Sequence, residues 1–229
     1  MSDLITKDDL LNALRSYSIT PDDDNVRFKE KIKDALLTCP ELLYAINEKD
    51  LESELFIEYD DDDGKKQIDI NWDGDWDKYF SDSTRDGNIR PYLFIPETQT
   101  DVKHYVCYQT HFEEVPRYNA AEKYALITFT IFVHGEDRID VLTGIPRHDL
   151  IGSIIRDKIN WSNLFGTQCH LVSNKESVTD NNYVVRTMTF RVTNVNNIVK
   201  TVDGKTFNEN TGKYESVKRT LMINKLGGV

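Results

Sequence analysis

The sequence predicts an α+β fold in which a mostly antiparallel sheet is covered by a helix at about residues 147–160. Two observations carry this prediction. Apolar residues recur at helical spacing as far as residue 57, and from Pro91 they alternate as in extended strands, until a last helical stripe follows Pro146. A chain of 229 residues is long enough to bury one substantial core with elaborations around it.

Four segments are expected along the chain. The first is a helical unit and the second is acidic and rich in loops, because Asp and Gly are frequent there and no periodicity persists. The third is the α+β core domain, and the fourth is a polar C-terminal arm or hairpin with turn signals at Asp203-Gly204 and Thr211-Gly212. Their expected bounds are 1–57, 58–90, 91–195 and 196–229.

Three helices are predicted in the first segment. Thr6 is a suitable N-cap for a short helix over residues 6–17. A second apolar stripe begins at Val26 and ends before Pro40, since the residue before a proline disfavours the helical conformation. Pro40 can itself open a third helix, in which a break around residues 48–50 is an option.

Strands dominate the predicted core domain. Residues 92–95 form a short apolar strand, and a longer one follows over residues 104–112 by strict alternation. Residues 123–134 are apolar on both faces, which is typical of a central strand. Two further strands, 167–173 and 182–195, flank a polar loop at 174–181. One hairpin is also expected around Asp63-Gly64 in the acidic segment, which Trp72, Trp76, Tyr79 and Phe80 anchor to the core.

The charge of the chain is unevenly distributed. The formal net charge is -11, and residues 1–89 hold 24 acidic against 11 basic side chains, whereas residues 90–229 hold 15 against 17. An acidic first part repels phosphate, which argues against wrapping nucleic acid. It favours a partner with basic patches, or a surface past which DNA slides without binding.

Membrane and redox classes are disfavoured by the composition. No uncharged apolar run reaches the roughly 20 residues that span a bilayer, and the first residues lack the basic and apolar blocks of a signal peptide. Cys39, Cys107 and Cys169 are far apart, so each is expected to be a small buried side chain. We therefore expect a protein made in the cytoplasm, with no membrane contact.

A weak calcium pattern lies in the acidic segment. Asp69, Asn71, Asp73 and Asp75 place oxygen ligands at alternate positions around Gly74, as in a calcium-binding loop. The twelfth position of such a loop should be Glu, and here it is Phe80. A solvated acidic turn is the stronger interpretation. The neighbouring run Asp60, Asp61, Asp62 and Asp63 is expected to form an exposed acidic surface, because mutual repulsion keeps four adjacent carboxylates hydrated.

No catalytic constellation stands out. None of the five histidines has the spacing of metal ligands. A hydrolase that combines His148 and Asp149 with a remote serine is conceivable, but the Gly-x-Ser-x-Gly elbow and a phosphate-binding glycine loop are missing. We expect Asp149 to cap the helix, with Arg147 and His148 on the surface. The sequence thus predicts a protein that is not an enzyme and that needs no cofactor.

The segment from Gly144 to Val192 resembles the tail terminator and head-tail joining (neck) proteins of tailed bacteriophages. In that family a helix with an Arg-x-Asp type start, here Arg147-His148-Asp149, packs on a sheet whose last strands follow. The resemblance covers about residues 105–194 and is one of layout. It implies a virion structural subunit, commonly in a hexameric ring, that contacts neck or tail-tube proteins and lets DNA pass without specific binding.

Contact residues are predicted on this basis. Arg147 and His148 are expected to meet a neighbouring subunit or partner, and so are Lys213, Lys218 and Arg219 in the mildly basic C-terminal arm, which suits an acidic neighbour better than phosphate. The Asp60–Asp63 run is expected to face the DNA channel or an outer partner. Two alternatives stay open: a metal-dependent intracellular hydrolase using Asp69, Asp73 and Asp75, and a monomeric adaptor that binds a basic protein.

Overall fold

The computed structural model describes most of the first 195 residues and three short stretches beyond them. The described ranges are 7–8, 11–12, 24–60, 64, 66–70, 76–81, 86–96, 102–113, 122–179, 182–195, 201–202, 205–208 and 213–216. Residues 7–8 and 11–12 are helical, and the rest of the helix predicted at 6–17 lies outside these ranges.

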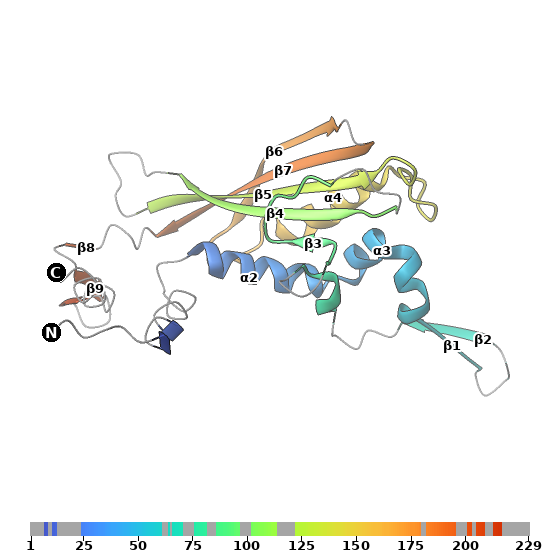
Figure 1. The fold of residues 1–229 in the computed structure, drawn as a ribbon, viewed down its shortest axis with the longest axis horizontal. Coiled ribbons are helices and arrows are strands. Elements are labelled where there is room, and N and C mark those ends of the chain that lie inside the picture. Colours follow the sequence, from blue (N-terminus) through green and yellow to red (C-terminus); the bar gives the residue numbers. More distant parts are fainter. Residues whose placement is uncertain are drawn as a thin grey trace.

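A five-stranded sheet forms the body of the protein (Figure 1). Its strand order is β3-β4-β5-β7-β6, and every pairing is antiparallel except the parallel contact of β3 with β4. The bounds are β3 Ile89–Arg90, β4 Tyr105–Glu113, β5 Glu122–His134, β6 Cys169–Val178 and β7 Tyr183–Val195. The central strand predicted at 123–134 is confirmed, because β5 lies between β4 and β7 and pairs with β7 over its whole length.

Three helices cover one face of this sheet (Figure 1). They are α2 Asp24–Leu37, α3 Pro40–Leu55 and α4 Arg147–Ile159. The helices and the inward residues of the strands bury a common core, in which Phe28 and Ile32 of α2, Leu42 of α3 and Ile155 of α4 meet Phe129 of β5. The predicted α+β class, with a mostly antiparallel sheet covered by a helix, is therefore confirmed.

The other face of the sheet is only partly covered. Tyr105, Phe132 and Tyr183 form a second buried cluster, over which Phe94 packs. The strand predicted at 92–95 is wrong: these residues are irregular and cross the sheet, and the strand is β3, just before them. The reason is that the Phe94 ring packs edge-on against Tyr105, with the ring centroids 5.3 Å apart, instead of joining a ladder.

A hairpin extends from the end of α3, as Figure 1 shows. It consists of β1 Phe56–Asp60 and β2 Lys66–Ile70, which confirms the hairpin predicted around Asp63-Gly64. The third helix has its break one residue earlier than considered, at Asn47, whose φ and ψ are -127° and 27°. Of the four predicted anchors, Trp76 and Tyr79, which precede and end the short 3-10 helix η1 (Asp77–Tyr79), are buried, and Phe80 is partly buried against the core. Trp72 lies outside the described residues.

Strand β6 is longer than its sequence indicates. Residues 174–178, predicted as part of a polar loop, continue the ladder with β7 after a bulge between Leu171 and Ser173. Exposed polar side chains hide an edge strand from periodicity, because neither face needs to be apolar. Farther on, β8 Thr201–Val202, β9 Lys205–Asn208 and β10 Lys213–Ser216 form a separate antiparallel sheet. Of the helices described, none has the length and apolar character needed to cross a membrane.

Candidate functional site

A buried arginine at the start of α4 connects three parts of the fold. Only 1% of the Arg147 side chain is exposed. Its Nη1 donates to the carbonyl oxygen of Ala45 at 2.9 Å, and its Nη2 donates to Glu48 at 2.8 Å. Asp137 and Asp140 add carboxylate oxygens at 3.2 and 3.4 Å. Arg147 therefore ties α4 to α3 and to the segment that leaves β5.

His104 extends this cluster toward the sheet. Its Nδ1 accepts a hydrogen bond from the backbone N–H of His134 at 3.2 Å, so the ring proton of the neutral imidazole is on Nε2, which lies 3.1 Å from Asp137. Burial lowers the pKa of His104, and the nearby charge of Arg147 lowers it further, against the opposing effect of Asp137. Both ring nitrogens are engaged, and His104 has no free nitrogen to act as a base in this arrangement.

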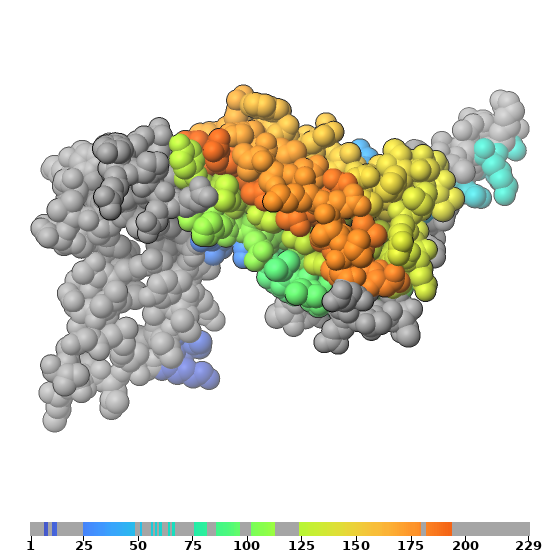
Figure 2. All heavy atoms as spheres, turned by 90° about the horizontal axis from the view of Figure 1, so that it is seen from above, coloured from blue at the N-terminus to red at the C-terminus, as the bar shows by residue number. Residues whose placement is uncertain are grey.

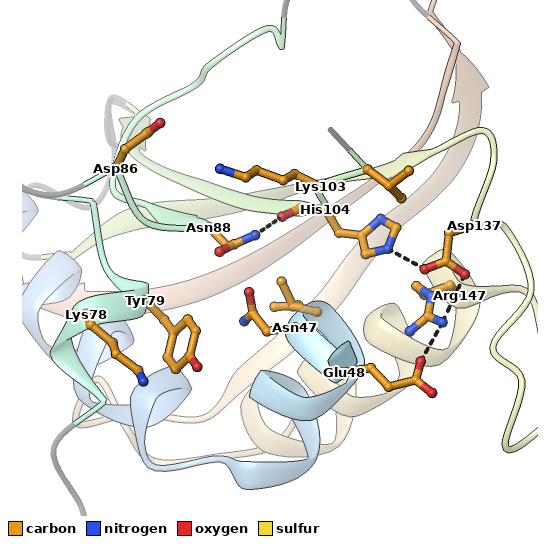
Figure 3. A pocket seen from close by; sticks show the side chains of 12 residues that line it. Asn47, Glu48, Lys78, Tyr79, Asp86, Asn88, Lys103, His104, Asp137 and Arg147 are labelled. Atoms are coloured by element: carbon orange, nitrogen blue, oxygen red, sulfur yellow. Dashed lines mark hydrogen bonds and ion pairs between the residues drawn. The ribbon is translucent and has the colours of Figure 1, made fainter. Parts of the chain in front are cut away.

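A polar pocket of about 390 Å³ opens beside the cluster (Figure 3). In Figure 3, Glu48, His104, Asp137 and Arg147 gather on one side, and the side chains across from them come from α3, η1 and the turn before β3. The lining mixes three cationic with three carboxylate side chains, namely Lys78, Lys103, Arg147, Glu48, Asp86 and Asp137. Within it Arg147 already pairs with Glu48 and Asp137, and Asp86 pairs with the neighbouring Arg90. The Arg147 side of the pocket is therefore a structural junction.

The segment between β5 and α4 is a fixed loop with an apolar surface. We call Ile139–Ile145 the apolar loop. Val141 is 84% exposed and Leu142 77%, and Ile139 and Ile145 are about half-exposed. These exposures put four apolar side chains in water on one short segment.

Hydrogen bonds hold the apolar loop in one conformation. The buried Asp140 carboxylate accepts from the backbone N–H and the hydroxyl of Thr143, at 2.8 and 2.6 Å. The N–H of Gly144 donates back to the Asp140 carbonyl at 2.8 Å, and Gly144 has a φ of 69°, which a glycine adopts without strain. Because Asp140 also faces Arg147, the buried cluster fixes the base of the loop.

The expected surface position of Arg147 and His148 is wrong. His148 is 6% exposed, and its Nε2 lies 3.5 Å from a carboxylate oxygen of Glu176. Asp149 makes no helix cap; its carboxylate pairs with Arg186 of β7. A helical pattern assigns charged residues to the water-facing side, but here acidic side chains from other elements surround the buried Arg147, and Glu176 lies beside His148.

The other predicted site residues fall at the margins of the structure. Asp60 is exposed at the end of β1, Asp69 lies in β2 and Lys213 opens β10. Outside the described residues lie Asp61, Asp62, Asp63, Asn71, Asp73, Asp75, Lys218 and Arg219. Calcium binding thus stays a prediction; within the described ranges no three His, Cys, Asp or Glu side chains form a metal-binding group.

The cysteines behave as predicted. Cys39, Cys107 and Cys169 are free and fully buried. Burial raises their pKa values, to about 11 for Cys39 and Cys107 and about 12 for Cys169. A thiol that stays protonated at neutral pH is a poor nucleophile, so these residues serve packing.

Sequence reasoning missed the acidic partners of Arg147. The sequence patterns single out neither Asp137 nor Asp140, and they place Glu48 only in the break of a predicted helix. The signal that existed was the pair of aspartates three residues apart just before an arginine-led helix. It is a weak signal, because charged residues at a strand end are usually solvated.

Comparison with known proteins bears on this part of the chain. The family model named YomW matches residues 40–192, which is two thirds of the sequence. The chain belongs to the YomW family. The family takes its name from a Bacillus prophage region, which suggests a phage origin. The match runs from the first residue of α3 into β7, so it includes the Arg147 cluster and the apolar loop. No curated protein matches the chain.

Proposed function

We propose that this protein is a virion structural subunit that assembles into a ring, as a tail terminator or head-tail connector. The observation that carries the proposal is the apolar loop. Exposed apolar area of this kind is unfavourable in water, and a contiguous apolar patch on a folded protein commonly marks an interaction surface.

The fixed conformation of the loop supports an assembly role. A flexible segment loses conformational entropy when it docks, whereas a loop already held by Asp140, Gly144 and the Arg147 cluster loses little. The apolar area of Val141 and Leu142 would contribute roughly 25 cal/mol for each Å² buried. Such a loop is suited to repeated contact with copies of one partner surface.

Other features agree with a subunit of a phage particle. The name of the family suggests a phage origin. Strand β6 is the outer strand of the five-stranded sheet, and past Leu171 no described strand pairs with its outer edge, which suits contacts by strand addition. We further propose that the acidic segment with Asp60–Asp63 faces the DNA channel, and that Lys213, Lys218 and Arg219 contact an acidic neighbour, in a hexamer located in the virion.

The competing functions are less well supported. For a hydrolase, His104 is the histidine in the described pocket, and both of its nitrogens already have partners. A monomeric adaptor would use the apolar loop for a foreign protein and would leave the purified chain monomeric. The assembly state of the purified protein therefore distinguishes the two functions: an adaptor is monomeric and a ring subunit is oligomeric.

The test is the mass and shape of the purified full-length protein. We expect light scattering to give a multiple of the subunit mass and negative-stain images to show rings with an open centre. Leu142→Asp should shift the protein to monomers, because a charge would have to be buried in the contact. Ile95→Asp is the matched control, since Ile95 is 65% exposed but lies outside the loop and outside the β6 edge. A chain that stays monomeric at millimolar concentration, and that is absent from purified phage particles, would contradict the proposal.

A further inference from the structure

A second unusual surface lies beyond the far end of α4. Trp161 is 64% exposed and its φ is 62°, a conformation that bulky side chains rarely adopt. Its ring stacks on His170 at 6.0 Å, and His170 lies 3.2 Å from Arg191, whose guanidinium lies over the ring of Tyr124 at 5.5 Å. We call Trp161, His170, Arg191 and Tyr124 the Trp161 platform.

The platform is built across the open face of the sheet. Arg191 of β7 pairs in register with His170 of β6 and, on its other side, with Leu126 of β5. Leu126 is only partly buried and shares this row. Strain at an exposed aromatic residue does not stabilise the core, and strained positions cluster at functional sites. The platform and the adjoining Leu126 therefore have the composition of a contact surface: aromatic rings, an aliphatic side chain and a cation.

The apolar loop and the Trp161 platform lie at opposite ends of the body. The loop directly precedes α4 and Trp161 follows it, and a helix of 13 residues is about 20 Å long. Along the sheet, the loop follows His134 and the platform lies at Leu126, a separation of about 26 Å at the rise of a strand. Figure 1 shows β5 and α4 running between these two ends, and Figure 2 views the molecule from above the sheet. One chain cannot bring its own loop onto its own platform.

The two surfaces complement each other. Both present apolar side chains to water. Two charged side chains beside the loop are exposed, Glu136 and Arg138; Arg138 donates to Asn182 at 3.2 Å, and Glu136 is opposite in charge to the exposed Arg191 of the platform. A contact between two different patches of identical chains is heterologous, and it closes into a ring when the rotation between subunits divides a full turn. In such a head-to-tail contact, the two patches lie at opposite ends of each subunit, as the loop and the platform do here.

We propose that the apolar loop of one copy packs on the Trp161 platform of the next copy, with Leu142 against Trp161. The occupant of the platform is thus a second copy of this chain. The inference rests on the proposed ring-forming function and specifies its subunit contact. It also gives a role to the exposed Trp161 ring, which has none in the core of the fold.

Cysteine cross-linking in full-length protein tests the contact. One preparation carries Leu142→Cys and the other Trp161→Cys; the two are mixed and oxidised with copper phenanthroline. We expect disulfide-linked dimers in the mixture and none in either preparation alone. The native cysteines do not interfere, because all three are buried with raised pKa values. Leu142→Cys mixed with Ile95→Cys is the matched control and should not link, because Ile95 is exposed and lies outside both surfaces.

A second measurement does not depend on cross-linking. Trp161→Ala should keep the melting temperature within a few degrees and weaken subunit association at least tenfold, whereas Trp161→Phe should restore association. One outcome is that rings form without a Leu142–Trp161 cross-link and persist in Trp161→Ala. That result would contradict this contact and would still agree with the proposed ring function. Linked dimers in Leu142→Cys alone would show a loop-to-loop contact and would also overturn it. A chain that never oligomerises overturns both proposals, and DNA binding that Trp161→Ala abolishes in such a monomer would assign the platform to nucleic acid instead.

Discussion

Two arginines beside α4 have similar partners and very different surroundings. Arg147 is buried, and so is one of its carboxylates, Asp140. Arg186 of β7 is 14% exposed and pairs with Asp149 and Glu176, which are about half-exposed. The comparison shows that the same ion-pair chemistry has two roles here. Water screens the Arg186 pairs, whereas the Arg147 cluster holds separate elements together where water cannot replace a lost partner.

The two clusters also differ in what they connect. Arg186 joins β7 to the first turn of α4 and to the adjacent edge strand β6. Arg147 joins α3, the end of β5 and the base of the apolar loop. Loss of Arg186 should therefore remain local, and loss of Arg147 should release the loop that we propose as the assembly contact.

Removing Arg147 should have the largest effect. Arg147→Ala leaves Asp140 and its neighbours without a counter-charge, and we expect the free energy of unfolding in urea to fall by about 3–5 kcal/mol. Arg147→Lys keeps the charge and loses the planar fork, so it should recover only part of the loss. Hydrogen exchange at Thr143 and Gly144 should speed up in both variants. A loss below about 1 kcal/mol for Arg147→Ala would show that the cluster is not a structural junction.

Removing Arg186 should have a smaller effect that depends on salt. We expect Arg186→Ala to cost about 1 kcal/mol in low salt, because its partners are substantially solvated, and to cost less in 1 M NaCl, where exposed charges are screened. Asn174→Ala, which removes only the 2.9 Å hydrogen bond to Arg186, is the matched control and should cost less still. An Arg186→Ala effect as large as that of Arg147→Ala, and insensitive to salt, would remove the distinction between the two sites.

Acid should lower the free energy of unfolding through His104, which belongs to the Arg147 cluster. We expect this effect to be smaller than those of Arg147→Ala and Arg186→Ala. The pKa of His104 is below its ordinary 6.5, so as the pH falls through 6.5 the unfolded chain takes up a proton that the folded chain does not. The pKa of Asp137 is also lowered, because His104 and Arg147 outweigh the opposing effect of burial, and its stabilisation is lost only below the ordinary 3.8.

Urea unfolding between pH 5 and 7 measures this effect. The free energy of unfolding should decrease as the pH falls below 6.5, and His104→Gln should flatten that decrease. His111→Gln, at an exposed histidine of β4, is the control and should leave the decrease unchanged. Equal slopes for the two variants would show that His104 contributes nothing to it.

Much of the fold could be predicted from the sequence, and less of the candidate site. Apolar periodicity identified α2, β4, β5 and α4, because burial of one face or both is a local pattern. It failed at residues 92–95, because an irregular segment with apolar side chains resembles a strand in the sequence. It also failed at β6, because an edge strand with polar side chains resembles a loop. The Arg147 cluster could not be predicted, because its partners come from positions 48, 137 and 140 and meet only through tertiary packing.

The full-length pairing of β5 with β7 has a consequence for synthesis of the chain. Hairpin β4–β5 is complete once residue 134 has emerged, but the partner of the free β5 edge is β7, which begins at residue 183. Until then a strand of 13 residues that is apolar on both faces has one open edge. Such an edge can pair with another nascent chain, so the order of synthesis creates a period of aggregation risk. A lower growth temperature or chaperone co-expression should raise the soluble yield by protecting this intermediate.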